Sequence, residues 1–530
     1  MLSQRSVAWL AMMSVIIGSF VLAADDPPKK ADDQKKPKAQ FTISKETTYV
    51  TGPLREGGYI DYVAALNERM KQGVTPENNA MVLLVRALGP APEGVKLPDR
   101  YFKDLGCEAP PADGKYFREF DKFLKDSNKP AFENDQYWDF LQRLSSRSWS
   151  RKEFPDAANW VEANAEPLRW VHLASLRTHY YSPVFSYYRP EDYHGLISAL
   201  NPSIKMLHLG QLLLSRALLL ITEGKYVEAK QDILACHRLA RLVSQDATTI
   251  DYILGTSLET QAIHAAVSWL EHPKLPISLV LEYKRELAVL KPLPKLFDKI
   301  DGAERYLFLD TTFLVSQQGF KYLEQLSGGS GDGIGIKLFD LLLFNDLNWD
   351  PALKKGNAWY DRIVAALKNT DRNERIRATD EIESEVKLLR AKLLSELGSR
   401  VAESKESRVL VIYDMIRCLM MTGIHNVQIS ADRIEQQQRH LQLAIALALY
   451  HREKGQYPEK LSELSPKYLP TIPLDLFSGK DVIYSRTSKG YRLYSVGPNG
   501  KDDGGVKDED YPHKADDILL EVPLPEWKKK

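Results

Sequence analysis

The clearest pattern of hydrophobic and polar positions lies between residues 204 and 270. Two apolar helices are predicted there, on either side of the turn Glu223-Gly224-Lys225. A stripe at three- and four-residue spacing is typical of a helix with one buried face. In the second helix this stripe comprises Ala229, Ile233, Cys236, Ala240 and Val243. The segment therefore predicts a packed helix pair.

Similar helical patterns, separated by proline and glycine, continue over residues 43–430. Thr75-Pro76-Glu77 is a typical helix start, with Thr as the cap and Pro in the first turn. Alternation with a period of two is almost absent, and no repeat of about 34 residues recurs. We expect a mainly α domain over 43–430, built as an irregular bundle or a solenoid of helix pairs.

The pattern changes in the tail, where we expect a small α+β domain over residues 431–526. A helix over 431–454 is predicted to stop at Gly455, and a short helix should follow around Leu461 to Leu464. Two strands, 482–485 and 491–495, flank Ser488-Lys489-Gly490, which is a hairpin signal.

The N-terminus carries the features of a secretory signal. A basic residue precedes the apolar run Val7 to Leu22, and small residues follow at Ala23 and Ala24. We predict a signal peptide over 1–24 and a periplasmic or extracellular protein. An uncleaved membrane anchor is the alternative, and only then is a membrane a partner. Residues 25–42 are rich in Asp, Lys and Pro, which predicts a disordered tether.

Composition narrows the classes of partner. The 530 residues include 71 Lys and Arg and 71 Asp and Glu, so the formal net charge is zero. A nucleic-acid binder normally shows a basic excess, so no nucleic-acid partner is expected. The three cysteines, Cys107, Cys236 and Cys418, are far apart, and one long-range disulfide remains open.

The chain lacks several motifs that catalysis by known enzyme classes requires. It contains no His-Glu-x-x-His, no Gly-x-Ser-x-Gly and no Gly-x-x-x-x-Gly-Lys-Ser/Thr. Glu259 and His264 share a predicted helix but lie five residues apart, on different faces. His237 and His264 are therefore interpreted as satisfied core or surface histidines.

Three other features admit two interpretations each. Asp298, Asp301 and Glu304 recur every three residues, so they form either a divalent-ion site or a solvated acidic face. The aromatic segment 180–188 either offers stacking faces to a sugar or peptide or anchors a loop. The glycine-rich segment 327–335 is a surface loop rather than a phosphate site, because no strand precedes it and no Lys-Ser or Lys-Thr closes it.

After the hairpin, acidic residues alternate with glycine in Val496-Gly-Pro-Asn-Gly-Lys-Asp-Asp-Gly-Gly505, and Asp516-Asp517 follow. Calcium takes six to eight oxygen ligands and accepts backbone carbonyls, so this composition suits calcium. A solvated acidic loop is the alternative.

The order Tyr457-Pro458, Pro470 to Pro473, Ser495-Val-Gly-Pro-Asn499 and Asp516-Asp-Ile518 resembles the globular domain of the major pseudopilin of bacterial type II secretion. The resemblance covers the last eighty or so residues. It implies a calcium ion held by five residues: Val496 and Lys514 through their carbonyls, and Asn499, Asp516 and Asp517 through their side chains. Asn499 replaces the usual Asp of that family, which removes one negative charge. The intervening loop is longer and carries its own acids, and Asp502, Asp503 or Asp508 could restore that charge.

The whole chain looks like a family of large exported bacterial helical proteins that carry this tail. We expect an exported scaffold or binding protein with a calcium-stabilised tail, whose partner is an unknown protein or a surface glycan. One alternative is an exported enzyme with a pocket among the helices. Another is an accessory component of a type II secretion or pilus-like system, although the chain lacks a prepilin start.

Overall fold

A computed structural model describes residues 40–130, 132, 134–185, 195–200, 204–326, 344, 346–420, 423–506 and 515–524. The fold is mainly helical, with a small three-stranded antiparallel sheet near the C-terminus. This confirms the predicted fold class at that level. The predicted signal peptide lies outside the described residues, as does the tether up to residue 39. Gln40 forms a β-bridge with Asn348 and accepts a hydrogen bond from the Trp349 amide, and the Thr42 amide donates to Asp350. The last residues of the predicted tether, 40–42, are therefore held by the folded part.

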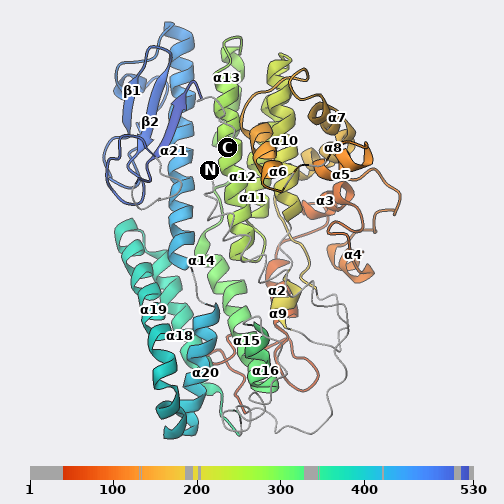
Figure 1. Ribbon diagram of the computed structural model, residues 1–530, viewed down its shortest axis with the longest axis vertical. Coiled ribbons are helices and arrows are strands. Elements are labelled where there is room, and N and C mark those ends of the chain that lie inside the picture. The colour runs from red at the N-terminus through yellow and green to blue at the C-terminus, as the bar shows by residue number, and fades with distance from the viewer. Residues whose placement is uncertain are drawn as a thin grey trace.

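Two hydrophobic cores organise the helices, and Figure 1 shows their elements stacked along the long axis. The first core lies among these helices: α3 (Met81–Leu88), α4 (Asp99–Leu105), α5 (Phe120–Asp126), α6 (Asn134–Ser146), α7 (Pro155–Ala163), α8 (Ala165–Ser175), α10 (Ile204–Thr222), α11 (Tyr226–Val243), α12 (Thr249–Leu270) and α13 (Ile277–Ala288). The second core lies among these: α2 (Tyr62–Met70), α9 (Leu196–Ala199), α14 (Leu296–Lys299), the π-helical turn η1 (Ile300–Glu304), α15 (Arg305–Gln318), α16 (Phe320–Leu326), α18 (Asp350–Lys368), α19 (Arg372–Glu403) and α20 (Lys405–Met420).

The helix pair predicted around Gly224 is confirmed as α10 and α11. Gly224 adopts a φ of 75°, which a residue with a side chain rarely adopts, and this allows the tight turn. All five stripe residues of α11 are buried in the first core. Helix α12 continues the layer and begins with a reciprocal capping box between Thr248 and Asp251.

Helix α10 belongs to the segment Leu196–Thr222, which is long and apolar enough to cross a membrane. Most of this segment is buried inside the protein, where α10 packs against α6, α11 and α12. The core helix of a folded protein can be equally long and apolar, so the packing of α10 in the interior explains its composition.

Helix α21 (Ile424–Lys454) connects the two cores. Its 31 residues extend about 46 Å. It begins seven residues before the predicted start, and it ends at Gly455 in the left-handed conformation, as predicted. It packs against α19 near the second core and against α12 and α13 in the first. The boundary predicted between residues 430 and 431 thus lies within a continuous helix.

The sheet covers the C-terminal part of α21 (Figure 1). The short 3-10 helix η2 (Leu461–Leu464) precedes β1 (Ile483–Arg486), β2 (Tyr491–Ser495) and β3 (Ile518–Val522), in the order β1-β2-β3. The hairpin of β1 and β2 was predicted, whereas β3 was not. One face of the sheet carries the buried side chains of Tyr491, Leu493 and Leu520, and this face packs into the first core. The sheet and the helices therefore share one interior.

The aromatic segment after residue 180 is buried where the structure describes it. Tyr180 and Tyr181 are 4% and 2% exposed, so they offer no stacking face to a sugar or peptide. That interpretation is wrong for these two rings, and they anchor the loop instead. Residues 186–194 and the glycine-rich segment 327–335 lie outside the described residues.

Candidate metal centre

The sheet register brings the two halves of the predicted calcium site together. Ser495, the last residue of β2, pairs with Ile518, the first residue of β3. In an antiparallel pair, the residue after one strand lies beside the residue before its partner. Val496 therefore lies beside Asp517, although twenty residues separate them in sequence. Lys514, the fifth predicted ligand, lies outside the described residues.

Asp517 is fully buried and only partly satisfied. Its Oδ2 accepts hydrogen bonds from the backbone amides of Gly505 (2.7 Å) and Asp503 (3.1 Å). Its Oδ1 is buried and has no hydrogen-bond partner among the described residues. Burial raises the pKa of Asp517, and the nearby carboxylate of Asp503 adds to this effect. A buried carboxylate oxygen without a partner is costly, and a bound cation would remove that cost.

Asp516 precedes Asp517 in the chain and is 6% exposed. Its Oδ2 pairs with Arg433 of α21 at 3.1 Å, and its Oδ1 accepts from the backbone amide of Asn499 at 3.4 Å. Burial raises the pKa of Asp516, and the Arg433 charge opposes that rise. The guanidinium of Arg433 therefore partly neutralises the negative charge of the Asp516 carboxylate.

Asn499 and Asp503 complete the cluster. The Asn499 amide nitrogen donates to Asp503 Oδ2 at 2.9 Å, and its oxygen accepts from the Lys501 amide at 2.7 Å. The backbone amide of Asp516 donates to the same Asp503 oxygen at 3.3 Å. The structure therefore brings Asn499, Asp503, Asp516 and Asp517 together around the Val496 turn.

Gly497 allows this close approach. Its φ is 66°, and a Cβ at this position would lie 2.6 Å from Asp516 Oδ1 and would also clash with the Asp516 carbonyl oxygen. Only glycine fits between the turn and the aspartates without movement.

The residues fit a calcium ion in part. The unpartnered Asp517 oxygen, the adjacent Asp516 and the close turn suit an oxygen-coordinated cation. Among the described residues, no three His, Cys, Asp or Glu side chains form a metal-holding group. A site here would thus use Asp516 and Asp517 with the Val496 carbonyl and Asn499, and the Lys514 carbonyl lies outside the described part.

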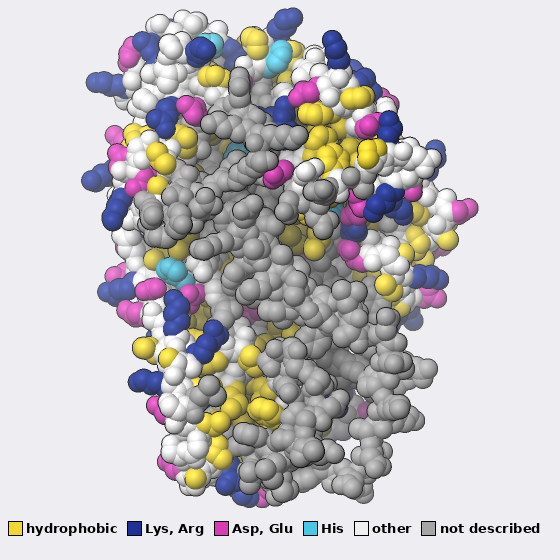
Figure 2. Space-filling view, viewed as in Figure 1, with side chains coloured by type: hydrophobic (Ala, Val, Ile, Leu, Met, Phe, Trp, Pro, Cys, Tyr) yellow, Lys and Arg dark blue, Asp and Glu magenta, His cyan; other side chains and the backbone are white. Residues whose placement is uncertain are grey.

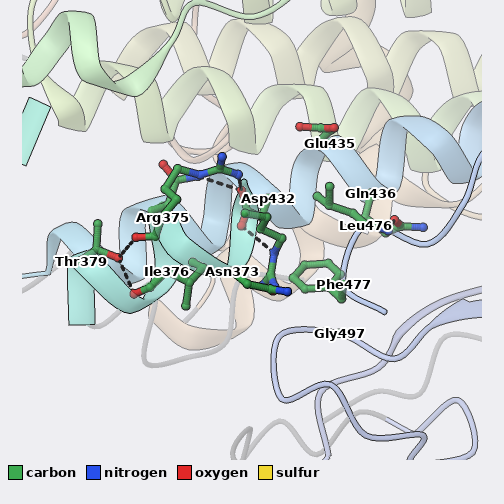
Figure 3. Close-up of polar contacts among 12 residues, drawn as sticks. Asn373, Arg375, Ile376, Thr379, Asp432, Glu435, Gln436, Leu476, Phe477 and Gly497 are labelled. Atoms are coloured by element: carbon green, nitrogen blue, oxygen red, sulfur yellow. Dashed lines mark hydrogen bonds and ion pairs between the residues drawn. The ribbon is translucent and has the colours of Figure 1, made fainter. Parts of the chain in front are cut away.

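A polar joint connects this module to α19. Asp432 of α21 pairs with Arg372 (2.9 Å) and Arg375 (3.2 Å) of α19, and the Arg372 guanidinium lies 4.3 Å from the centre of the Phe477 ring. Figure 3 shows Phe477 and Gly497 beside this joint. Phe477 also packs with Val496 and Ile518 in a small hydrophobic cluster beneath the candidate centre. The joint thereby links the turn to the second core.

The acidic series predicted on one helix face is distributed differently. Asp298 is exposed, Asp301 pairs with Arg305 at 2.8 Å, and Glu304 accepts two hydrogen bonds from Thr249. The π-helical turn, which has a wider spacing than an α-helix, separates these side chains. Asp301 and Glu304 therefore have separate protein partners, so they form neither the predicted shared metal site nor the predicted solvated acidic face.

Glu259 has partners that helix spacing does not reveal. His237 of α11 bonds Glu259 of α12 at 2.8 Å through Nδ1 and Tyr283 of α13 at 2.9 Å through Nε2. Arg241 and Gln438 bond the same carboxylate. Burial alone raises the pKa of Glu259, but His237 and Arg241 outweigh it and lower the pKa to about 2. His237 is thus a satisfied core histidine, as predicted.

The three cysteines are free thiols, and burial raises the pKa of each. They form no disulfide in this structure. Thiolate chemistry is correspondingly disfavoured at these positions.

Comparison with known proteins gives no relative. No protein-family model, no curated protein sequence and no solved structure matches the chain. The resemblance to the pseudopilin domain therefore remains a prediction from the residues quoted above.

Proposed function

We propose that the protein is an exported scaffold or binding protein whose C-terminal sheet module is stabilised by calcium. The observation that carries the calcium proposal is the buried Asp517 Oδ1, which has no partner in the described part of the chain. The preceding residue, Asp516, lies against the close turn at Gly497. The sequence of residues 1–24 supports export. The ion would hold β3 and its preceding loop against the β2 turn.

The partner would bind to the helical part. On the face shown in Figure 2, described Lys and Arg side chains are interspersed with Asp and Glu, so neither sign dominates this face. Such a surface favours a neutral or mixed-charge partner over a polyanion. A protein or a surface glycan has this character.

Thermal unfolding of the mature protein tests the calcium proposal. Calcium should raise Tm by several degrees relative to EGTA, because a ligand that binds only the folded state stabilises it. Magnesium should do less, since it binds flexible carbonyl-rich sites poorly. An Asp516→Asn, Asp517→Asn double variant should lose the calcium shift.

The matched control is Asp481→Asn, which changes an exposed aspartate of the same module. This variant should keep the full calcium shift. Equal Tm values in calcium and EGTA for the unaltered protein would refute the calcium site. Export is tested separately by the mass of the protein recovered from the periplasm or medium, which should lack residues 1–23 or 1–24.

A further inference from the structure

Arg433 of α21 approaches the candidate metal centre from the helix side. Its Nη2 lies 3.1 Å from Asp516 Oδ2, and its Nη1 donates to the Asp516 carbonyl oxygen at 3.4 Å. The side chains of Arg433 and Asp516 are 28% and 8% exposed, so little water surrounds the pair. Charges in such a place are screened less than charges at the surface. Arg433 is therefore a positive charge held at the edge of the centre.

The two carboxylate oxygens of Asp516 face different parts of the molecule. Oδ2 faces α21 and the guanidinium of Arg433. Oδ1 faces the turn, because it accepts from the Asn499 amide at 3.4 Å and lies 2.6 Å from the position that a Cβ of Gly497 would take. A hydrogen bond of this length is weak, so the protein satisfies Oδ1 poorly. A cation beside Asp517 would therefore share the Asp516 carboxylate with Arg433.

In the described part of the chain, Arg433 relies on Asp516 for its counter-charge. Both of its hydrogen bonds end on Asp516. The neighbouring acid on α21, Asp432, is already bonded to Arg372 and Arg375. A guanidinium that lies mostly out of water is costly without a partner. Calcium that draws on the charge of Asp516 therefore weakens the ion pair of Arg433.

The net charge of the centre governs how strongly it attracts calcium. The carboxylates of Asp503, Asp516 and Asp517 carry three negative charges when they are ionised, and Asn499 adds none. The positive charge of Arg433 reduces this total from −3 to −2. Calcium affinity in proteins depends on the charge of the ligand set. Arg433 therefore lowers the affinity for calcium, whereas without calcium the same charge offsets the repulsion among the carboxylates.

We propose that Arg433 is an internal counter-cation that regulates the calcium site. It stabilises the tail when calcium is absent, and it limits the affinity when calcium is present. This inference rests on the proposed calcium site and adds its regulation. The dissociation constant should accordingly lie at about 10⁻⁴ to 10⁻³ M, the range of extracellular calcium modules. The tail would then bind calcium only where calcium is abundant.

The experiment measures the calcium affinity of the full mature protein by isothermal titration calorimetry with calcium chloride, and its Tm in EGTA. Arg433→Gln removes the charge but keeps an amide donor for Asp516. This variant should bind calcium about ten-fold more tightly and should have a lower Tm in EGTA. Arg433→Lys keeps the charge, so its affinity should stay within about three-fold of that of the unaltered protein.

The matched control is Arg439→Gln. Arg439 lies on the same helix, its side chain is 27% exposed, and it pairs with Glu435 at 2.7 Å. It also donates to the Leu474 carbonyl oxygen, so its loss weakens a contact between α21 and the tail. This variant should have a lower Tm in EGTA and in calcium alike, with unchanged calcium affinity. A purely structural role of Arg433 would give the same result for Arg433→Gln.

The outcomes separate this inference from the calcium proposal. Calcium binding by the unaltered protein, with equal or weaker binding by Arg433→Gln, would overturn the role of Arg433 and leave the calcium site standing. Binding by Arg433→Gln alone would support the role of Arg433 and show that this residue blocks the site. Absence of binding by both would refute the site and the inference together. If Arg433→Gln is unfolded in EGTA, refolding on addition of calcium, followed by circular dichroism, supports the inference, and a chain that stays unfolded overturns it.

Discussion

Two buried acidic groups in this protein have opposite surroundings. Glu259 lies among α11, α12, α13 and α21, and His237, Arg241 and Gln438 contact both of its oxygens. Asp517 lies just before β3, and one of its oxygens has no partner among the residues that the structure describes. The surroundings lower the pKa of Glu259 to about 2 and raise the pKa of Asp517.

The difference separates a structural role from a ligand-binding role. A carboxylate with a complete set of partners holds helices together and leaves nothing for a ligand to contact. A buried carboxylate with an unsatisfied oxygen destabilises the protein until a cation or a proton binds. Burial alone therefore does not identify a site, whereas the missing partner does.

The largest expected effect is that of Glu259→Ala. The substitution removes the carboxylate that the buried His237 contacts and that pairs with the half-buried Arg241. The free energy of unfolding should therefore fall by about 3 to 5 kcal/mol. Urea unfolding followed by circular dichroism measures this. The control is Glu162→Ala, which removes a 60% exposed partner of Arg151 and should cost less than about 1 kcal/mol. Equal losses would contradict the structural role.

Gly497→Ala should have the next largest effect. The new Cβ clashes with Asp516, and the φ of 66° is unfavourable for alanine, so the loss should reach about 2 to 3 kcal/mol in calcium. Gly500→Ala is the matched control, because its φ is 70° and no atom lies within 4 Å of its Cβ position. It should cost about 1 kcal/mol and preserve the calcium shift. Indistinguishable variants would refute the close approach.

The two sites should also respond to pH in opposite directions. The pKa of Glu259 falls from 4.5 to about 2 on folding, so its contribution is present above pH 4.5 and is lost as the pH falls towards 2. The pKa of Asp517 is raised above 3.8, so its contribution is present below 3.8 and is lost as the pH rises through the folded pKa.

In EGTA, Asp517→Asn should therefore remove part of the stability loss that follows a rise in pH from 3.8. Unfolding free energies over this pH range, with and without calcium, check the result. In calcium the same variant should be less stable than the unaltered protein, because it loses a ligand. A variant less stable in both conditions would contradict the unsatisfied oxygen.

Glu271 is a third buried carboxylate, and its substitution should change the free energy of unfolding only slightly. One oxygen accepts from the Leu524 amide at 3.1 Å, and burial raises its pKa from 4.5 to about 7. Its contribution is present below pH 4.5 and is lost as the pH rises through 7. Glu271→Gln keeps an acceptor for Leu524 and should gain about 1 kcal/mol above pH 7. Glu381→Gln, at a 62% exposed site, should gain nothing.

The sequence predicted the elements whose pattern is local. The stripe of α11, the stop at Gly455 and the hairpin of β1 and β2 each follow from neighbouring residues. Strand β3 was missed because Ile-Leu-Leu-Glu-Val does not alternate cleanly, and its pairing partner lies over twenty residues away. The π-helical turn at Ile300–Glu304 was missed because no sequence spacing marks it.

The candidate sites show the same limit. Asn499, Asp516 and Asp517 were predicted from a motif. The sequence left open which of Asp502, Asp503 and Asp508 joins them, and the loop conformation brings Asp503 to the cluster. The pairing of Glu259 with His237 joins two helices, and each residue alone resembles an ordinary core position. Tertiary packing, and not the local sequence, determines which of these residues contact one another.

The composition of the two cores determines when each core can fold as the chain is synthesised. The first core contains both Ala80 and Val522, and the second contains both Ile60 and Val427. The first core therefore cannot close until residue 522 has been synthesised, and the second cannot close before residue 427. This arrangement keeps long stretches of the chain from folding early during synthesis. The apolar helices of the first core remain partly exposed until β3 has been synthesised. A chain truncated before residue 518 should therefore aggregate and should not form a shorter folded protein.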